Sequence, residues 1–348
     1  MNSTLTLLLC TLVSFVMSAA HTTEPLDFEY NGITLSGVLD TPEEGAPKGI
    51  VLILHGDGQT DAVAGKWWYD VRHAILDAGY ATYMWDKPGC GKSGGTYRQG
   101  RPIQDEAAEV SAAIDYLKAQ GIGGSETIGL WGISRAGWVA PVVIDRRNDI
   151  AFWMSVSGVD DDETFKYLLE QNLLLEGHPR DSVAMMIDEW HDGLLLSRGG
   201  ASYEYYMRAT ATLQRNPFWQ TITGGGITEE GYYQYQKVLQ STPLDTVTDL
   251  PLYVEGFEPM LRRIDIPVLA LFGSMDKTVD WQQTKALYEQ CLTSSVDLTM
   301  RTFSNCNHNM WQCETGGLYE LQSSGAYVRC EGFLASITEW LEELSVGR

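Results

Sequence analysis

Basic residues are scarce in this 348-residue sequence, in which 24 Lys and Arg stand against 46 Asp and Glu, giving a formal net charge of −22 at pH 7. A surface with this charge repels the phosphates of nucleic acids and anionic lipid headgroups. We therefore predict no nucleic-acid partner and no electrostatic binding to a membrane. The charge alone does not identify a substrate.

Long apolar runs are also rare. The run from Leu5 to Met17 is too short to span a bilayer comfortably, and Ser18-Ala19-Ala20 behind it supplies the small residues that a signal peptidase needs. We therefore predict a signal peptide over residues 1–20 and a secreted or periplasmic protein, although no Lys or Arg precedes the run. An uncleaved N-terminal anchor is the alternative. No later segment offers about 18 uninterrupted apolar residues, so no other membrane span is expected.

Cysteine is sparse, and five of the six cysteines follow the predicted signal peptide. In an oxidising compartment, the clustering of four of them near the C-terminus predicts two disulfides there, with Cys90 left over. The four are Cys291, Cys306, Cys313 and Cys330, and their pairing cannot be read from the sequence. A zinc site of Cys306, His308 and Cys313 is an alternative, although this spacing is not that of a standard ligand pair.

Apolar runs and amphipathic segments alternate through the first half of the chain. A hairpin of residues 26–30 and 33–39 comes first, joined at Asn31-Gly32. Buried strands are then predicted over 49–54, 80–85, 127–133 and 151–156, and helices over 67–78, 103–120 and 135–147. This alternation predicts an α/β fold, with a mostly parallel twisted sheet that helices cover on both faces.

The alternation stops between residues 158 and 267. Helices are predicted there over 160–177, 182–197, 203–213 and 229–239, without a convincing buried strand. We therefore predict a helical cap over 160–262, inserted between two parts of one core, residues 21–159 and 263–348. Strands over 267–272 and 296–303 and helices over 282–291 and 330–344 complete the core.

The strongest chemical motif is Gly132-Ile133-Ser134-Arg135-Ala136-Gly137. It follows a predicted strand and opens a predicted helix, which is the setting of a nucleophile elbow. The tight turn requires small neighbours around the serine. Gly132 meets this requirement, and Ala136 replaces the second glycine of G-x-S-x-G.

With this motif in this setting, the chain resembles the α/β-hydrolase superfamily over nearly all of its mature length. The helical insertion falls where that family carries its cap. The resemblance implies that Ser134 is the nucleophile, Asp276 the acid after the strand that follows the cap, and His308 the base after the last strand. The order Ser, Asp, His is the family's own. For the acid, Asp280 is the nearest alternative, and the cluster from Asp160 to Asp162 is another.

The resemblance also implies an oxyanion hole made of two backbone N–H groups. One belongs to Arg135, the residue after the nucleophile. The other lies in His55-Gly56-Asp57-Gly58, where Asp57 best matches the donor position and Gly56 and Gly58 are alternatives. His55 matches a structural histidine of the family, so we expect it to support this loop.

A second glycine-rich motif, Gly91-Lys92-Ser93, resembles part of a phosphate-binding loop. Such a loop also needs a glycine five residues before Gly91, and Asp86 stands there. The segment from Asp86 to Ser93 instead resembles the superfamily's D-x-P-G-x-G-x-S turn. We therefore predict no nucleotide binding, and we expect the chemistry to need no metal or organic cofactor.

Together these residues predict a serine hydrolase that cleaves carboxylic esters of small to medium acyl groups through an acyl-enzyme. A serine peptidase that acts on short peptides is the alternative, because a large cap would restrict access to small substrates. A non-catalytic binding protein on the same fold is a third reading. It is less favoured because all three triad positions carry a suitable residue. The oligomeric state cannot be read from the sequence.

Overall fold

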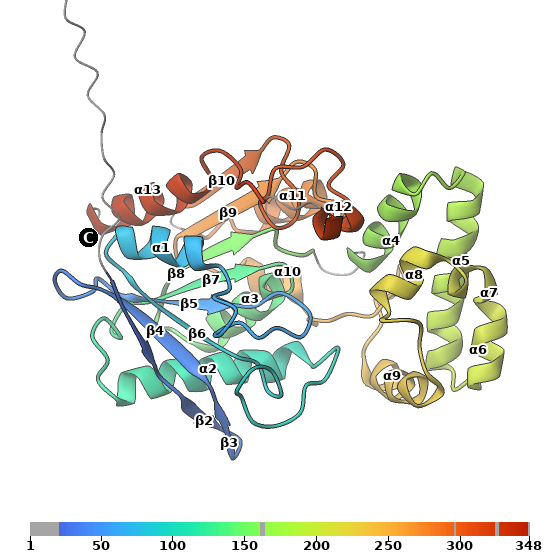
Figure 1. The fold of residues 1–348 in the computed structure, drawn as a ribbon, viewed down its shortest axis with the longest axis horizontal. Helices are drawn as coiled ribbons and strands as arrows, with labels where there is room; N and C mark the ends of the chain where they lie inside the picture. Colours follow the sequence, from blue (N-terminus) through green and yellow to red (C-terminus); the bar gives the residue numbers. More distant parts are fainter. Residues whose placement is uncertain (1–20, 161–163, 296, 324–326, 347–348) are drawn as a thin grey trace, which may run out of the picture.

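The computed structural model describes residues 21–160, 164–295, 297–323 and 327–346. The predicted signal peptide and two of the alternative acids, Asp161 and Asp162, lie outside the described residues. Eight strands form one sheet in the order β1-β4-β6-β5-β7-β8-β9-β10, with helices on both faces (Figure 1). The predicted α/β architecture with a mostly parallel sheet is confirmed.

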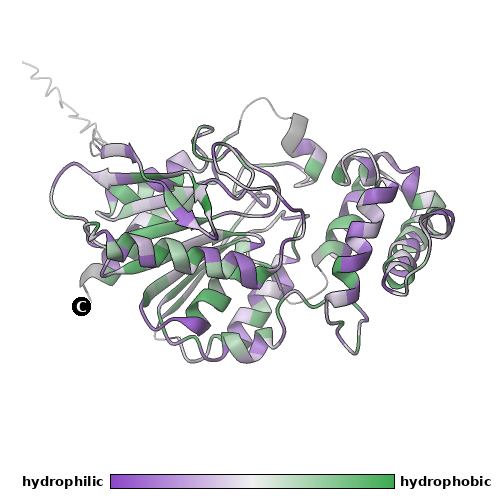
Figure 2. Cartoon of the chain, turned by 90° about the horizontal axis from the view of Figure 1, so that it is seen from below, coloured by the Kyte–Doolittle hydropathy of each residue, from purple (hydrophilic) through white to green (hydrophobic). Residues whose placement is uncertain are grey.

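The parallel part of the sheet is made by six strands. They are β5 (Ile50–Leu54), β6 (Ala81–Trp85), β7 (Ile128–Ile133), β8 (Ile150–Val156), β9 (Val268–Gly273) and β10 (Leu298–Phe303). Every residue of β5, β6, β7 and β9 is buried, as continuous apolar runs require of strands that are covered on both faces. Figure 2 shows these strands as a hydrophobic layer between the helices.

The N-terminal hairpin differs from the prediction. The expected strand over 33–39 is broken into β3 (Ile33–Leu35) and β4 (Gly37–Pro42). β3 pairs with β2 (Phe28–Tyr30) in a small separate sheet, whereas β4 joins the main sheet, antiparallel to β6 and to β1 (His21–Pro25). The break falls before Gly37, where a Cβ would lie only 2.4 Å from the carbonyl oxygen of Leu26.

Two sets of helices cover the sheet. One face packs on α1 (Tyr69–Asp77) and α13 (Phe333–Val346). The other packs on α2 (Ile103–Ala119), α3 (Ala136–Arg146), α10 (Phe257–Leu261) and α11 (Trp281–Cys291). Within the described ranges, no helix has both the length and the apolar character needed to cross a bilayer.

The inserted helices lie beside the sheet rather than on it (Figure 1). They are α4 (Thr164–Leu175), α5 (Arg180–Arg198), α6 (Tyr203–Ala209), α7 (Ala211–Gln214), α8 (Pro217–Ile222) and α9 (Glu229–Ser241). A small core of their own holds several of them together, with Leu169, Leu173, Leu213 and Phe218 fully buried. The predicted helix over 203–213 is divided at Thr210, whose hydroxyl donates to the carbonyl of Tyr206.

Helix α4 is bonded to the loop after β9. The Tyr167 hydroxyl donates to the carbonyl oxygen of Asp276 at 3.0 Å, and the Asn172 side-chain amide donates to that of Lys277 at 2.9 Å. The amide oxygen of Asn172 accepts the N–H of Leu318, the first residue of α12 (Leu318–Ser323), at 2.9 Å. One end of the insertion is therefore fixed to a loop that carries a predicted catalytic residue.

Candidate active site

Three loops at one edge of the sheet carry the three predicted catalytic residues. Ser134 follows β7, Asp276 follows β9, and His308 lies in the loop after β10. Because these strands run parallel, their carboxyl ends meet at the same edge, where ligands bind in open α/β sheets. The fold therefore brings residues separated by up to 174 positions to one edge of the molecule.

Ser134 occupies a tight strand-to-helix turn. Its φ of 56° is in the left-handed region, which is uncommon for a residue other than glycine and is often found at functional sites. Its N–H donates to Val156 at 3.0 Å, and its carbonyl accepts the N–H of Gly137 at 2.7 Å. A Cβ at Gly132 would lie 2.7 Å from that of Ala136. This crowding explains why the motif is built from small residues.

Asp276 and His308 are in direct contact. Nδ1 of His308 lies 2.7 Å from Oδ2 of Asp276, and both side chains are buried. The other carboxylate oxygen accepts the N–H groups of Thr278 at 2.8 Å and Val279 at 2.9 Å. These two bonds fix the carboxylate, which in turn fixes the plane of the imidazole. With its proton on Nδ1, the ring presents the lone pair of Nε2 on the side away from Asp276.

The loop of His308 is held by two residues that the sequence did not single out. The Ser157 hydroxyl donates to the backbone carbonyl of His308 at 2.8 Å. Gly273, the last residue of β9, lets the loop pass closely, because a Cβ there would lie 2.5 Å from the carbonyl oxygens of Cys306 and Asn307. The only sequence signal for Ser157 is a serine at the end of an apolar strand.

One disulfide closes this loop, and it corrects the prediction of two. Within the described ranges the four clustered cysteines form the single pair Cys306–Cys330. Cys313 is a thiol on the loop surface with Sγ near the carbonyl of Asn305, whereas Cys291 is fully buried in the main core. Because the sulfur of Cys306 is bonded to Cys330, the alternative zinc site loses one of its three ligands.

Within the described residues, the backbone N–H groups of Arg135 and of residues 56–58, near Ser134, are available to a ligand. The loop after β5 passes against the serine, since a Cβ at Gly56 would lie 3.4 Å from Cβ of Ser134. In the part of the chain that the structure describes, neither Asp57 nor Arg135 uses its backbone N–H in a hydrogen bond. Arg135 also stands at the N-terminus of α3, where negative charge is favoured. These are the two donors predicted for the oxyanion hole.

His55 is bonded as a support of this loop. Its Nε2 lies 2.7 Å from the carbonyl oxygen of Trp85, and its ring stacks on Trp67 with centroids 5.2 Å apart. Burial, aided by the nearby charge of Lys87, lowers the pKa of His55 to about 3. The imidazole is therefore neutral at ordinary pH, and its Nε2 is occupied by the backbone.

The side chain of Arg135 is buried beneath the same loop. Its Nε lies 3.1 Å from Oε1 of Glu106 and 4.0 Å from Oδ1 of Asp57. Arg135 therefore links the elbow to helix α2, which carries Glu106, and to the loop after β5. The charges partly neutralise one another, so this region offers no large excess of either sign to a substrate.

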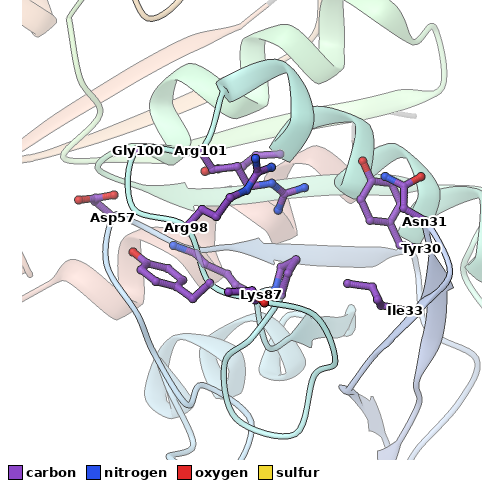
Figure 3. A pocket seen from close by; sticks show the side chains of 12 residues that line it. Tyr30, Asn31, Ile33, Asp57, Lys87, Arg98, Gly100 and Arg101 are labelled. Atoms are coloured by element: carbon purple, nitrogen blue, oxygen red, sulfur yellow. The ribbon is translucent and has the colours of Figure 1, made fainter. Parts of the chain in front are cut away.

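A cavity of about 200 Å³ borders the Asp57 side of this loop (Figure 3). Tyr30 and Asn31, near the turn between β2 and β3, line the cavity from another side. Its charged lining has both signs: Asp57, Lys87, Arg98, Arg101 and Glu106. Arg101 is already paired with Glu109. The recess next to the candidate site therefore combines these charges with the apolar surfaces of Ile33, Pro88 and Tyr97.

The glycine-rich segment after β6 folds around its own aspartate. Oδ1 of Asp86 accepts the N–H groups of Ala62 at 2.8 Å and Val63 at 3.0 Å, and Oδ2 accepts the N–H of Lys92 at 3.3 Å. A Cβ at Gly91 would lie 2.0 Å from Oδ2. The N–H groups of Gly89, Cys90 and Ser93 donate to backbone carbonyls, so these donors of the segment, like that of Lys92, are already bonded within the chain.

The alternative acids have other partners. The Asp280 carboxylate accepts the N–H groups of Gln282 at 3.1 Å and Gln283 at 3.2 Å and so caps helix α11. Asp160 is buried, and its carbonyl accepts the indole N–H of Trp138. Of the carboxylates considered, Asp276 is the one that the structure bonds to His308.

A sequence model of the family described as X-Pro dipeptidyl-peptidase (S15 family) matches residues 31–308, which is well over half of the chain. A search of curated proteins found no significant match.

Solved structures of hydrolases share the fold. The Pyrococcus furiosus esterase Pf2001 has a TM-score of 0.56 and 15% identity, over 94% of this chain and 92% of that one. Est1E of Butyrivibrio proteoclasticus, solved with ferulic acid, has a TM-score of 0.52 and 16% identity, over 92% and 98%. A Mycobacterium smegmatis proline iminopeptidase has a TM-score of 0.53 and 15% identity, over 93% and 99%. At such identities the likeness establishes the fold alone. The match to the S15 family model, a family of the α/β-hydrolase clan, confirms the resemblance to the superfamily.

Proposed function

The chain belongs to the X-Pro dipeptidyl-peptidase (S15) family, and from that premise we propose that this hydrolase acts through a triad of Ser134, His308 and Asp276. One observation carries the proposal. The buried carboxylate of Asp276 is bonded to the imidazole of His308 at 2.7 Å, at the sheet edge where Ser134 occupies a left-handed elbow. This combination has the roles of a nucleophile, a base and an orienting acid.

The chemistry is two-step acyl transfer. Nε2 of His308 takes the proton of the Ser134 hydroxyl as the serine oxygen bonds to the acyl carbonyl carbon, whose π electrons move onto its oxygen. Collapse of this tetrahedral intermediate expels the leaving group, which receives the proton from His308. Water then attacks the acyl-enzyme with the same assistance and regenerates Ser134. Asp276 stabilises the imidazolium in both steps.

The negative oxygen of the intermediate is bound by the N–H groups of Asp57 and Arg135. Both groups are without a hydrogen bond among the described residues, and Gly56 lies against Ser134. Donors that are already oriented toward the developing charge need no reorganisation during the reaction, and each is worth about a 100- to 1,000-fold effect on kcat.

For the substrate we propose a carboxylic ester with a small to medium acyl group. The esterases among the similar structures support this choice. A second candidate is a short peptide, which the name of the family and the proline iminopeptidase favour. The two substrates need the same triad and differ in the leaving group.

We also propose that the protein is exported. The buried pair Cys306–Cys330 supports this location, because disulfides persist mainly in oxidising compartments.

The test is hydrolysis of p-nitrophenyl esters from acetate to a long acyl chain, together with the p-nitroanilide of Gly-Pro. We expect Ser134→Ala to lose turnover on every substrate and to keep its thermal unfolding temperature. Ser304→Ala, which changes an exposed serine, is the matched control and should keep full activity. A fully active Ser134→Ala protein would overturn the proposal. Faster cleavage of the anilide than of any ester would favour the peptidase.

A further inference from the structure

Lys87 is bonded to the backbone on both sides of a proposed oxyanion donor. Its Nζ donates to the carbonyl oxygen of Gly56 at 2.6 Å and to that of Gly58 at 3.1 Å. Asp57 lies between these two glycines. Figure 3 shows Lys87 and Asp57 on the wall of the same recess. The ammonium group comes from the segment after β6, so it joins two neighbouring loops of the sheet edge.

Lys87 fixes the backbone of this loop, whereas the side chain of Asp57 accepts a hydrogen bond from the Gln99 amide at 2.9 Å. Among the described residues, no other group bonds to the backbone of residues 56–58. Gly56 and Gly58 also have no side chain that could anchor them. Gly58 has a φ of 93°, which side-chain-bearing residues rarely adopt. Without Lys87, the peptide groups of this short segment would therefore lose the hydrogen bonds that fix their orientation.

Because the peptide bond is planar, the contact of Lys87 with the Gly56 carbonyl also fixes the direction of the Asp57 N–H. In a trans peptide the C=O of one residue and the N–H of the next point in opposite directions. The described chain contains no cis peptide bond. Because the Gly56 carbonyl is directed at Lys87, the N–H of Asp57 points away from Lys87. We propose that Lys87 is a positioning residue, which holds the Gly56–Asp57 peptide so that its N–H faces the oxyanion formed at Ser134.

The charge of Lys87 adds to this effect. A cation bonded to a carbonyl oxygen withdraws electron density from the peptide and makes its N–H a stronger donor. The charges that face Lys87 are those of Glu106, Asp57 and Arg135. Burial lowers the pKa of Lys87, whereas Glu106 and Asp57 oppose this shift and Arg135 adds to it.

This inference rests on the proposed function, and its test separates the two. Lys87→Met removes the charge and keeps the length of the side chain, whereas Lys87→Arg keeps the charge. The measurements are kcat and KM on the best p-nitrophenyl ester, and the affinity of a trifluoromethyl ketone with the same acyl chain. The Ser134 oxygen adds to the carbonyl carbon of the ketone as His308 takes the hydroxyl proton, so the carbonyl oxygen becomes an oxyanion at the proposed hole.

We expect Lys87→Met to lower kcat by about ten- to a hundredfold, with KM changed by less than about twofold. The affinity for the ketone should fall by a similar factor, and Lys87→Arg should recover most of both losses. Lys92→Met removes the exposed lysine of the same turn and should behave as wild type. If Lys87→Met does not fold, Lys87→Gln takes its place with the same expectations.

A wild-type kcat in Lys87→Met, or in Lys87→Gln where that variant replaces it, would overturn the inference. So would a loss of kcat without a loss of ketone affinity, because binding of the oxyanion would then not depend on Lys87. A wild-type protein that neither hydrolyses the substrates nor binds the ketone would overturn the proposed function, and the role of Lys87 with it.

Discussion

The hydroxyl of Ser157 donates a hydrogen bond to the backbone carbonyl of His308 across 151 residues of sequence. The preceding residue, Val156, accepts the N–H of Ser134. The end of β8 therefore holds both the nucleophile elbow and the histidine loop. Their relative position depends on this strand as well as on the contact between His308 and Asp276.

Ser157→Ala should lower kcat by about tenfold, equivalent to about 1.4 kcal/mol, because it removes a buried hydrogen bond that positions the proposed base. The matched control is Ser155→Ala, which removes a buried bond to Tyr288 from the same strand. Both variants should be destabilised to a similar extent in thermal unfolding, whereas Ser157→Ala should lose far more activity than Ser155→Ala. Equal kcat values would show that the bond does not position His308.

Asp276→Asn should lower kcat by about 1,000- to 10,000-fold, because an amide cannot hold the imidazole in the correct tautomer or stabilise its cation. Asp280→Asn should leave kcat within about twofold, since asparagine caps a helix as well as aspartate does. Steady-state kinetics on one ester distinguishes the two. The reverse order of effects would assign the acid to Asp280.

Removal of the disulfide should destabilise the protein by about 3 kcal/mol, because Cys306 and Cys330 close a loop with a sequence separation of 24. Activity should be lost at a lower temperature than in wild type, since His308 lies inside this loop. The measurements are denaturant unfolding and residual activity of a Cys306→Ala, Cys330→Ala double variant. Cys313→Ser should have the stability and activity of wild type. If Cys313→Ser lost as much stability as the double variant, the assigned pairing would be contradicted.

Stability should fall as the pH drops below about 6.5, the pKa of an unfolded histidine. The folded state holds His55 with a pKa of about 3, so in this window the unfolded state binds the additional proton. The free energy of unfolding should therefore lose up to about 1.4 kcal/mol per pH unit from this group. Between pH 6.5 and 4.5, His55→Gln should reduce the slope of the free energy of unfolding against pH.

His73→Gln is the control for this slope. Burial also lowers the pKa of His73, but that ring is only half-buried, so its contribution to the slope should be smaller. An unchanged slope in His55→Gln would show that His55 does not remain neutral in the folded protein.

The motif around Ser134 carried the resemblance to the α/β-hydrolase superfamily, and that resemblance in turn implied Asp276 and His308. The structure places the strands that precede these three residues in one parallel sheet. The roles of Ser157 and Lys87 could not be predicted, because each depends on a contact with a distant backbone carbonyl. No local pattern distinguishes these two residues from other serines and lysines.

The errors in the predicted fold have similar causes. The strand over 33–39 breaks because Gly37 lies against Leu26 and Tyr83, and such a contact is invisible in the alternation of side chains. Helices α7 and α8 are too short for a periodic pattern to show. The disulfide could be located near the C-terminus but not paired, because pairing depends on which cysteines the folded chain brings together.

The three hydrogen bonds of Tyr167 and Asn172 fix the α4 side of the inserted helices to loops at the sheet edge. Swinging α4 away would pull on the backbone of Asp276 and Lys277, and so would disturb the carboxylate that is bonded to His308. A displacement of α6 and α9, at the far side of the insertion, breaks none of these bonds. We therefore expect changes of sequence in α6 and α9 to leave the contact between Asp276 and His308 intact, so this part of the insertion can vary without changing the proposed acid and base.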